Sequence, residues 1–281
     1  MTLDSSHAKP FVCFVHVEKA GGMTMHQILH HSVPGYISPH PGFGEHFDVN
    51  MLSKLSKFWP RKINGIGGHR MGAFLNYEQQ VSAPIFYMTF LRDPIRRYMS
   101  SINWKKYIMG QDWNIDSYGK ATHYYNFQCY RIAGERSFEK AKEILLNKFS
   151  FVGLMEEFDR SLLLLQHLLP VYNLDTRYVR ENVKDYGEVQ IKWDDLSSKQ
   201  QNQYRSNNEE DIRLYDFVSQ ELWPKYLKEY PSDLKEKEKE QKELLSQYTV
   251  KKNVVLKQKV SNYLLGRVWQ PLLFGKDLAP K

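Results

Sequence analysis

Three short apolar runs, each followed at once by residues with helical spacing, constrain the fold of this chain more than any other feature. The runs are residues 11–17 (FVCFVHV), 84–91 (PIFYMTFL) and 149–154 (FSFVGL). Short runs rich in Val, Phe and Leu predict strands that are buried on both faces, as in a parallel sheet. Strands that alternate with helices are typical of α/β domains. We therefore predict an α/β fold with a central parallel sheet flanked by helices.

The composition is typical of such a domain, and the net charge limits the classes of binding partner only partly. Hydrophobic residues make up 42% of the 281 residues and charged residues 25%, as in ordinary globular chains. The formal net charge of +7 favours an anionic partner, without choosing among a small anion, nucleic acid and a membrane surface. Only two cysteines are present, Cys13 and Cys129, which excludes a framework of several disulfides and fits a reducing compartment.

The localisation is predicted from the segments that the sequence lacks. The first apolar run begins at about residue 11, which leaves no room for the charged and apolar regions of a signal peptide. No run approaches the roughly 18 apolar residues that a membrane-spanning helix needs. We therefore expect a cytoplasmic protein, with the Golgi lumen as the alternative if an anchor was removed.

A lysine and a glycine pair stand where the first strand is expected to turn into a helix. Glycines let the backbone approach an anion closely, and the helix that follows offers free N–H groups and the positive end of its dipole. The segment is not a Walker A loop, because its lysine precedes the glycines. It can cradle a phosphate-like group, although a purely structural turn remains open. Its residues are Lys19, Ala20, Gly21, Gly22, Met23 and Thr24.

A second group of polar residues follows the run at residues 84–91. Arg92 comes directly after this predicted strand, and Asp93 and Pro94 are suited to the start of a helix. Ser100 lies two helical turns beyond Asp93, on the same face of that helix. Arg92 and Ser100 together suit one phosphate, while a capped helix with solvated charges is the alternative for this motif alone. Both motifs together predict two anion sites on one rim of the sheet.

At this point the sequence resembles the PAPS-dependent sulfotransferases, where PAPS is 3′-phosphoadenosine 5′-phosphosulfate. It is most similar to the carbohydrate branch that includes the heparan sulfate 2-O- and 6-O-sulfotransferases. FVHVEKAGGMT (14–24) resembles the family's 5′-phosphosulfate loop, and TFLRDPIRRYMSS (89–101) resembles its 3′-phosphate motif. FVGLMEEFDRSLLLLQHLLP (151–170) and NNEEDIRLYDFV (207–218) resemble later elements of that branch. The matches are spread over about residues 11–225.

The resemblance implies a P-loop-NTPase-like sheet and an activity. A sulfonate would move from PAPS to a hydroxyl, most simply on a carbohydrate. The product 3′-phosphoadenosine 5′-phosphate (PAP) would be released. Lys19 and the loop at 20–24 would hold the 5′-phosphosulfate, and Arg92 and Ser100 would hold the 3′-phosphate. The sequence does not identify the sugar or the hydroxyl, and tyrosine or small-molecule acceptors stay open.

Three positions depart from the family pattern and keep other functions open. Glu18 stands where proline is usual, Ala20 where Thr or Ser is usual, and Met23 where another hydroxyl is usual. Two side-chain donors to the sulfonate are therefore missing. One alternative is a catalytically degenerate module that binds acidic polysaccharide or membrane, and another is a nucleotide-dependent phosphotransferase. Nucleic acid is the least favoured partner, because the cations sit at strand ends rather than along one exposed stripe.

His69 is the candidate catalytic base. Sulfuryl transfer needs a group that removes the proton of the attacking hydroxyl, and histidine suits this task near neutral pH. His69 lies in the glycine-rich segment 65–74, between the two motifs, and resembles the histidine base of the carbohydrate branch. Lys19 would stabilise the charge that develops on the leaving oxygen. A purely structural histidine is the alternative for His69, and Glu45 and His46 are fallback bases.

No metal site is predicted. His26 and His30 have the i,i+4 spacing of a metal-binding pair on a helix, but the sequence offers no clear third ligand. We therefore interpret them as a surface pair. No metal is needed for the proposed transfer.

Two further segments have weaker indications of function. Residues 105–130 mix Trp, Tyr, Lys and Asn, which suits a cleft that stacks sugar rings, although these aromatics fit a core equally well. Arg180, Asn182 and Lys184 stand where the family often has another cofactor-contacting loop, and a solvated loop is the alternative.

The composition changes near Pro231. Residues 232–245 (SDLKEKEKEQKELL) form a charge run that is typical of a solvated helix, and residues 250–274 mix basic and apolar side chains. We therefore divide the chain into a sulfotransferase domain at 1–230 and a charged, amphipathic helical extension at 231–281. The basic and apolar part suits peripheral membrane binding, self-association or packing on the domain, and we favour packing.

Overall fold

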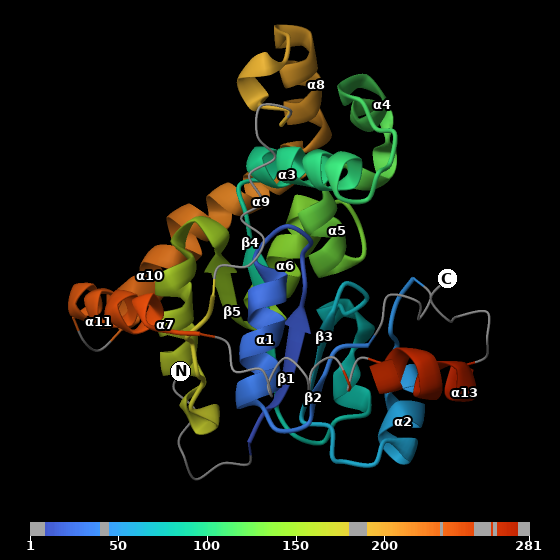
Figure 1. The fold of residues 1–281 in the computed structure, drawn as a ribbon, viewed down its shortest axis with the longest axis vertical. Coiled ribbons are helices and arrows are strands. Elements are labelled where there is room, and N and C mark those ends of the chain that lie inside the picture. Colours follow the sequence, from blue (N-terminus) through green and yellow to red (C-terminus); the bar gives the residue numbers. More distant parts are fainter. Residues whose placement is uncertain are drawn as a thin grey trace.

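The fold is α/β, with five parallel strands in the order β2-β3-β1-β4-β5 (Figure 1). The structure is a computed structural model, and it describes residues 9–39, 45–179, 190–230, 233–249, 260 and 263–274. This confirms the prediction of a parallel sheet flanked by helices. The strands are β1 Phe11–Val15, β2 Tyr36–Ile37, β3 Gly65–Gly68, β4 Ile85–Leu91 and β5 Phe149–Leu154.

The three apolar runs form strands β1, β4 and β5, and the glycine-rich segment forms β3. Strand β2 falls in a stretch rich in Pro and Gly that gives no strand signal, and it has only two residues. It pairs with β3 through Tyr36 and Gly65. A Cβ atom at Gly67 would lie only 1.9 Å from the Tyr36 hydroxyl oxygen. The glycines of β3 therefore make room for the tyrosine ring of its neighbour.

Helices follow the strands and cover both faces of the sheet. The predicted start of α3 is confirmed, because Asp93 accepts a 2.8 Å hydrogen bond from the Arg96 N–H and Pro94 is the first helical residue. The helices are α1 Gly22–Ser32, α2 Val49–Phe58, α3 Pro94–Tyr107, α4 Ile115–Lys120, α5 Phe127–Ala133, α6 Phe138–Lys148, α7 Phe158–Leu168, α8 Ser198–Asn207, α9 Glu209–Phe217, α10 Trp223–Glu229, α11 Leu234–Ser246 and α13 Gln270–Phe274.

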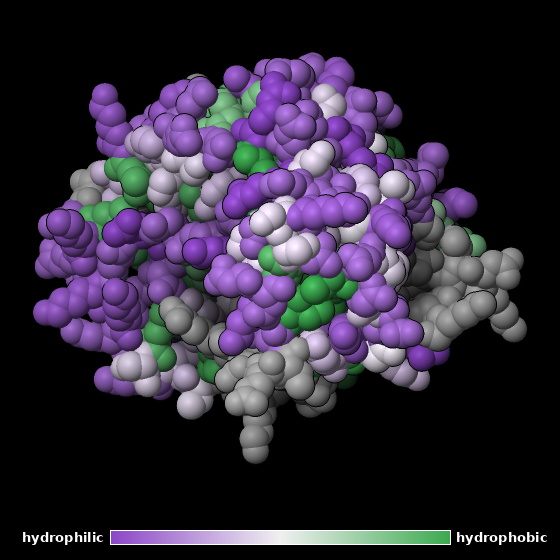
Figure 2. Space-filling view, turned by 90° about the horizontal axis from the view of Figure 1, so that it is seen from above, coloured by the Kyte–Doolittle hydropathy of each residue, from purple (hydrophilic) through white to green (hydrophobic). Residues whose placement is uncertain are grey.

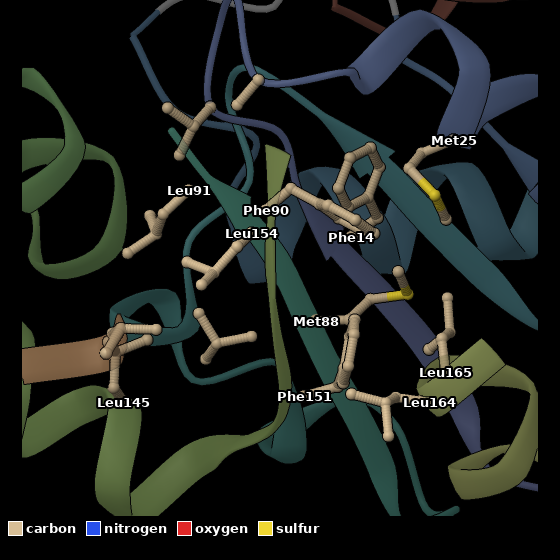
Figure 3. Packing of buried hydrophobic residues seen from close by; sticks show 14 of the residues in the cluster. Phe14, Met25, Met88, Phe90, Leu91, Leu145, Phe151, Leu154, Leu164 and Leu165 are labelled. Carbon is tan, nitrogen blue, oxygen red and sulfur yellow. The ribbon is translucent and has the colours of Figure 1, made fainter. Parts of the chain in front are cut away.

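Alternate residues of the strands feed two hydrophobic clusters, one on each side of the sheet. Figure 3 shows the first, where Phe14, Phe90 and Phe151 pack together with side chains of α1, α6 and α7. Cys13 belongs to the second cluster, together with residues of α2. Both cysteines of the chain are buried and free. Burial on both faces explains why these strands read as continuous apolar runs.

The described residues of the C-terminal region, 233–249 and 263–274, pack against the rest of the protein. Helix α11 contacts α7, where Glu238 pairs with Arg160. Leu265 is buried in the second cluster, and the Trp269 ring lies 6.0 Å from the Trp59 ring. For the described residues 263–274, the favoured interpretation of packing on the domain is confirmed, whereas residues 250–259 lie outside the described residues. Within the described parts of the chain, no helix has both the length and the apolar character that crossing a bilayer requires.

Candidate functional site

The loop between β1 and α1 has the backbone of an anion cradle. Lys19 and Gly21 both adopt left-handed conformations, with φ of 70° and 79°. Gly21 is the N-cap of α1, and among the described residues no side chain caps this helix. The first N–H groups of α1 therefore remain available to a ligand, where the helix dipole also favours negative charge.

Gly22 is required by close packing rather than by its conformation. A Cβ atom at this position would lie 1.7 Å from Nε2 of His16, so no other residue fits without a shift. The glycine pair thus has two distinct roles. Gly21 gives the left-handed turn, and Gly22 lets the His16 ring lie against the start of α1.

The structure brings the lysine loop and the arginine motif together. Strands β1 and β4 are neighbours, and the Arg92 guanidinium donates a 3.0 Å hydrogen bond from Nη1 to the Lys19 carbonyl oxygen. The Lys19 ammonium lies 5.1 Å from the centre of the Trp104 ring. Burial and the nearby Arg92 charge lower the pKa of Lys19 to about 8. Ser100 lies half-buried on α3.

Arg92 is held in place by residues that the sequence did not single out as site residues. The Gln128 side chain accepts a 3.0 Å hydrogen bond from the Arg92 N–H and donates a 2.9 Å bond to its carbonyl oxygen. Asp211, which is fully buried, in turn accepts hydrogen bonds from the N–H groups of Gln128 and Cys129. Asp211 lies in the segment 207–218, which resembles a helix of the sulfotransferase family, and this resemblance was the sequence signal that could have identified it.

His69 lies at the same edge of the sheet, directly after β3. Its Nδ1 is 3.4 Å from a Glu18 carboxylate oxygen and 3.3 Å from the His16 carbonyl oxygen. With Nδ1 turned to these acceptors, Nε2 is the nitrogen left to act as a base. Burial lowers the pKa of His69, against the opposing effect of Glu18, so the imidazole is neutral at neutral pH.

Glu18 also binds Arg131, and sequence reasoning missed this contact. The carboxylate accepts hydrogen bonds from both Nε and Nη2 of Arg131, a bidentate arrangement. Burial would raise the pKa of Glu18, but its interactions with His69, which becomes protonated in acid, and with the Arg131 guanidinium hold it below the usual range. The glutamate that departs from the family pattern therefore carries a negative charge beside the candidate base.

The interpretation of His26 and His30 as a surface pair is wrong. His26 is only 8% exposed, and its Nε2 lies 3.2 Å from Nδ1 of His16. Its Nδ1 lies 2.9 Å from the Tyr36 hydroxyl and 3.0 Å from Ser38 Oγ, which also contacts His30. These contacts satisfy the histidines without a metal. The described residues contain no group of three or more possible metal ligands of the His, Cys, Asp and Glu types.

The remaining candidates have other surroundings. Glu45 accepts a hydrogen bond from the Tyr130 hydroxyl, and the His46 ring packs edge-on against Phe74. In the segment 105–130, Tyr118 is a core aromatic that packs against other tyrosines, as the alternative for this segment allowed. Three further candidates, Arg180, Asn182 and Lys184, lie outside the described residues.

A cavity of about 480 Å³ opens beside the loop, between the start of α1 and the segment that follows β5. Gly21 and Thr24 line its loop side, and Phe158 and Tyr178 contribute aromatic rings. Within the described residues, neither His69 nor Arg92 lines it. The cavity therefore adjoins the loop on the side toward β5, apart from the candidate base.

No protein-family model matches the chain, and no curated protein is significantly similar to it. The functional assignment therefore rests on the residues and their geometry.

Proposed function

We propose that this protein is a PAPS-dependent sulfotransferase with a P-loop-like sheet, which transfers a sulfonate group to a carbohydrate hydroxyl. The observation that carries the proposal is the hydrogen bond between Arg92 and the Lys19 carbonyl. It joins the two motifs that we assign to anion binding, which follow neighbouring parallel strands. Ligands of open α/β sheets bind at this carboxyl edge, and PAPS has anionic groups at two separate positions.

The loop suits the 5′-phosphosulfate despite its missing hydroxyls. Ala20 is 1% exposed and packs in the first hydrophobic cluster, so its methyl group serves the core. The uncapped start of α1 offers backbone N–H donors in place of side-chain hydroxyls. Lys19 would add the cation, and Arg92 with Ser100 would bind the 3′-phosphate.

The cavity beside the loop suits the nucleoside rather than a phosphate. Its aromatic residues can stack on a base. Its four carboxylates outnumber the two cations Arg160 and Lys242, so the lining disfavours an anion and can accept hydrogen bonds from an amino group. The acidic lining residues are Glu156, Glu157, Asp159 and Glu238.

The chemistry follows from the surroundings of His69 and Lys19. PAPS would supply an activated sulfonate with a phosphate oxygen as the leaving atom. As the acceptor oxygen forms its new bond to sulfur, its proton would pass to Nε2 of His69. Glu18 would stabilise the resulting imidazolium, 3.4 Å away in the structure. A positioned base such as His69 typically contributes about 10²–10⁴-fold to the rate. Lys19 would offset the negative charge that develops on the leaving oxygen.

Transfer of radiolabelled sulfonate from PAPS tests the proposal. The acceptors would be desulfated heparan and chondroitin chains, a tyrosine peptide and a simple phenol. We expect transfer to a polysaccharide, lost in His69→Ala and retained in His31→Ala, because His31 is exposed in the last turn of α1. Turnover with ATP and Mg²⁺ instead of PAPS would favour the phosphotransferase. PAP binding without transfer to any acceptor would favour the degenerate module, for which the missing hydroxyl at Met23 is the supporting observation.

A further inference from the structure

The last described helical stretch is apolar on two sides, although only one side has a partner among the residues that the structure describes. It comprises the π-helical segment Leu264–Trp269 and helix α13. On the inner side, Leu265 is 1% exposed, and Trp269 and Leu273 pack with the second hydrophobic cluster against α2. A helix that is hydrophobic all round is normally covered all round.

The outer side carries a row of exposed apolar side chains. Leu264, Val268 and Leu272 are 40%, 37% and 73% exposed, and they recur every four residues. This spacing places them along one side of the helical stretch. On neighbouring α2, Phe58 is also half exposed, next to the Trp59 ring that contacts Trp269. We call Phe58, Leu264, Val268 and Leu272, together with the exposed cations near them that the next paragraph names, the α2–α13 face.

The α2–α13 face is basic, and its described elements, α2 and the stretch 263–274, contain no acidic residue. Its exposed cations come from α2, from the loop after it and from the π-helical segment. The sequence has no Asp or Glu at residues 49–77 or 260–274. The whole end of the sequence repeats this bias, because residues 250–281 hold seven Lys and Arg against one Asp, which is +6 of the chain's +7. The cations are Lys54, Lys57, Arg61, Lys62 and Arg267.

The combination of apolar side chains and cations selects among possible occupants. A second copy of the chain paired about a two-fold axis would place these cations opposite one another, which is repulsive. An anionic phospholipid surface satisfies both features, because the side chains Leu264, Val268 and Leu272 can enter the headgroup boundary while the lysines and arginines pair with lipid phosphates. We infer that the α2–α13 face is a docking surface for anionic membranes.

A protein docked on a membrane through the α2–α13 face would keep its candidate site accessible. In Figure 1, α2 and α13 lie toward the end opposite α3, which begins at the carboxyl end of β4. The end that carries α3 and α8 presents a mainly hydrophilic surface in Figure 2. The docking surface does not depend on the proposed sulfotransferase activity.

Vesicle co-sedimentation of the full chain tests this inference. The probes are vesicles of phosphatidylcholine alone and of phosphatidylcholine mixed with phosphatidylserine. We expect binding to the mixed vesicles only, weakened by salt. Leu272→Glu should lower the vesicle affinity about tenfold, because a large exposed apolar side chain is replaced by an anion. Leu146→Glu is the matched control, since Leu146 is 53% exposed on α6, outside the face.

The outcomes separate the possible occupants. Lys54→Glu combined with Lys57→Glu should also weaken binding, and circular dichroism would show that each variant is folded. Absence of binding to the mixed vesicles would overturn the inference, as would equal losses in Leu272→Glu and Leu146→Glu. Dimerisation that Leu272→Glu abolishes, without vesicle binding, would overturn it in favour of a second copy.

Discussion

Arg92 and Lys19 are joined through a 3.0 Å hydrogen bond from the arginine side chain to the lysine backbone. The two residues leave neighbouring strands at the same edge of the sheet. The arginine therefore fixes the loop, and its charge adds to the effect of burial in lowering the pKa of the lysine ammonium. Within the described residues Lys19 and Arg92 form no ion pair, although the Glu156 and Asp93 carboxylates act on Arg92, and this pair of cations favours an anionic ligand.

The lowered pKa of Lys19 predicts how PAP binding depends on pH. Its ammonium is charged below about pH 8 and becomes neutral as the pH rises through that value. A bound phosphate would raise the pKa of Lys19, so the PAP affinity should fall as the pH increases above about 8. Lys19→Met should bind PAP more weakly and show no such fall. Calorimetric titrations at several pH values measure both, and the same slope in wild type and variant would contradict this role.

The pair of Glu18 and His69 predicts an acid limb in the activity profile. Burial lowers the pKa of His69, so the neutral base persists below pH 6.5, its ordinary value, and activity is lost as the pH falls through the lowered value. Glu18→Gln removes the carboxylate that raises the pKa of His69, so the midpoint of this limb should move to lower pH. A purely structural role for Glu18 would leave the midpoint of kcat/KM against pH unchanged.

Gly22→Ala tests the close packing at the start of α1. The added methyl group would meet the His16 ring, and we expect a loss of about 2–3 kcal/mol in the free energy of unfolding. The double variant with His16→Ala should recover part of this loss, because the space is restored. Urea denaturation of the two single variants and the double variant measures the coupling. Strict additivity would show that the two residues do not meet.

Asp211→Asn tests the support behind Arg92. The asparagine amide cannot accept from both N–H groups of Gln128 and Cys129, so we expect about 2–3 kcal/mol less stability and weaker PAP binding. Asp216→Asn on the same helix is the matched control, because Asp216 is exposed. Equal stability and equal PAP affinity of Asp211→Asn and Asp216→Asn would exclude this support.

The strands and helix starts could be predicted because their signals are local. The apolar runs, and Asp93 before Pro94, are visible within a few residues. Long-range contacts could not be predicted, because no periodic pattern in the sequence indicates them. Glu18 and Arg131 are 113 positions apart, and Gln128 and Asp211 are 83 positions apart. The burial of His26 was missed although its partner His16 is only ten residues away, because the contact depends on how the loop after β1 turns α1 back against His16.

The most direct test of the proposed function is a calorimetric titration of the folded protein with PAP and, in parallel, with ADP. Only PAP carries the 3′-phosphate, and ADP also differs in its second 5′-phosphate, so the comparison is made in wild type and in Arg92→Gln to test the site assigned to Arg92 and Ser100. The proposal predicts a micromolar Kd for PAP, much weaker binding of ADP, and loss of this difference in Arg92→Gln. Equal affinities for PAP and ADP, or no PAP binding by folded protein, would contradict it.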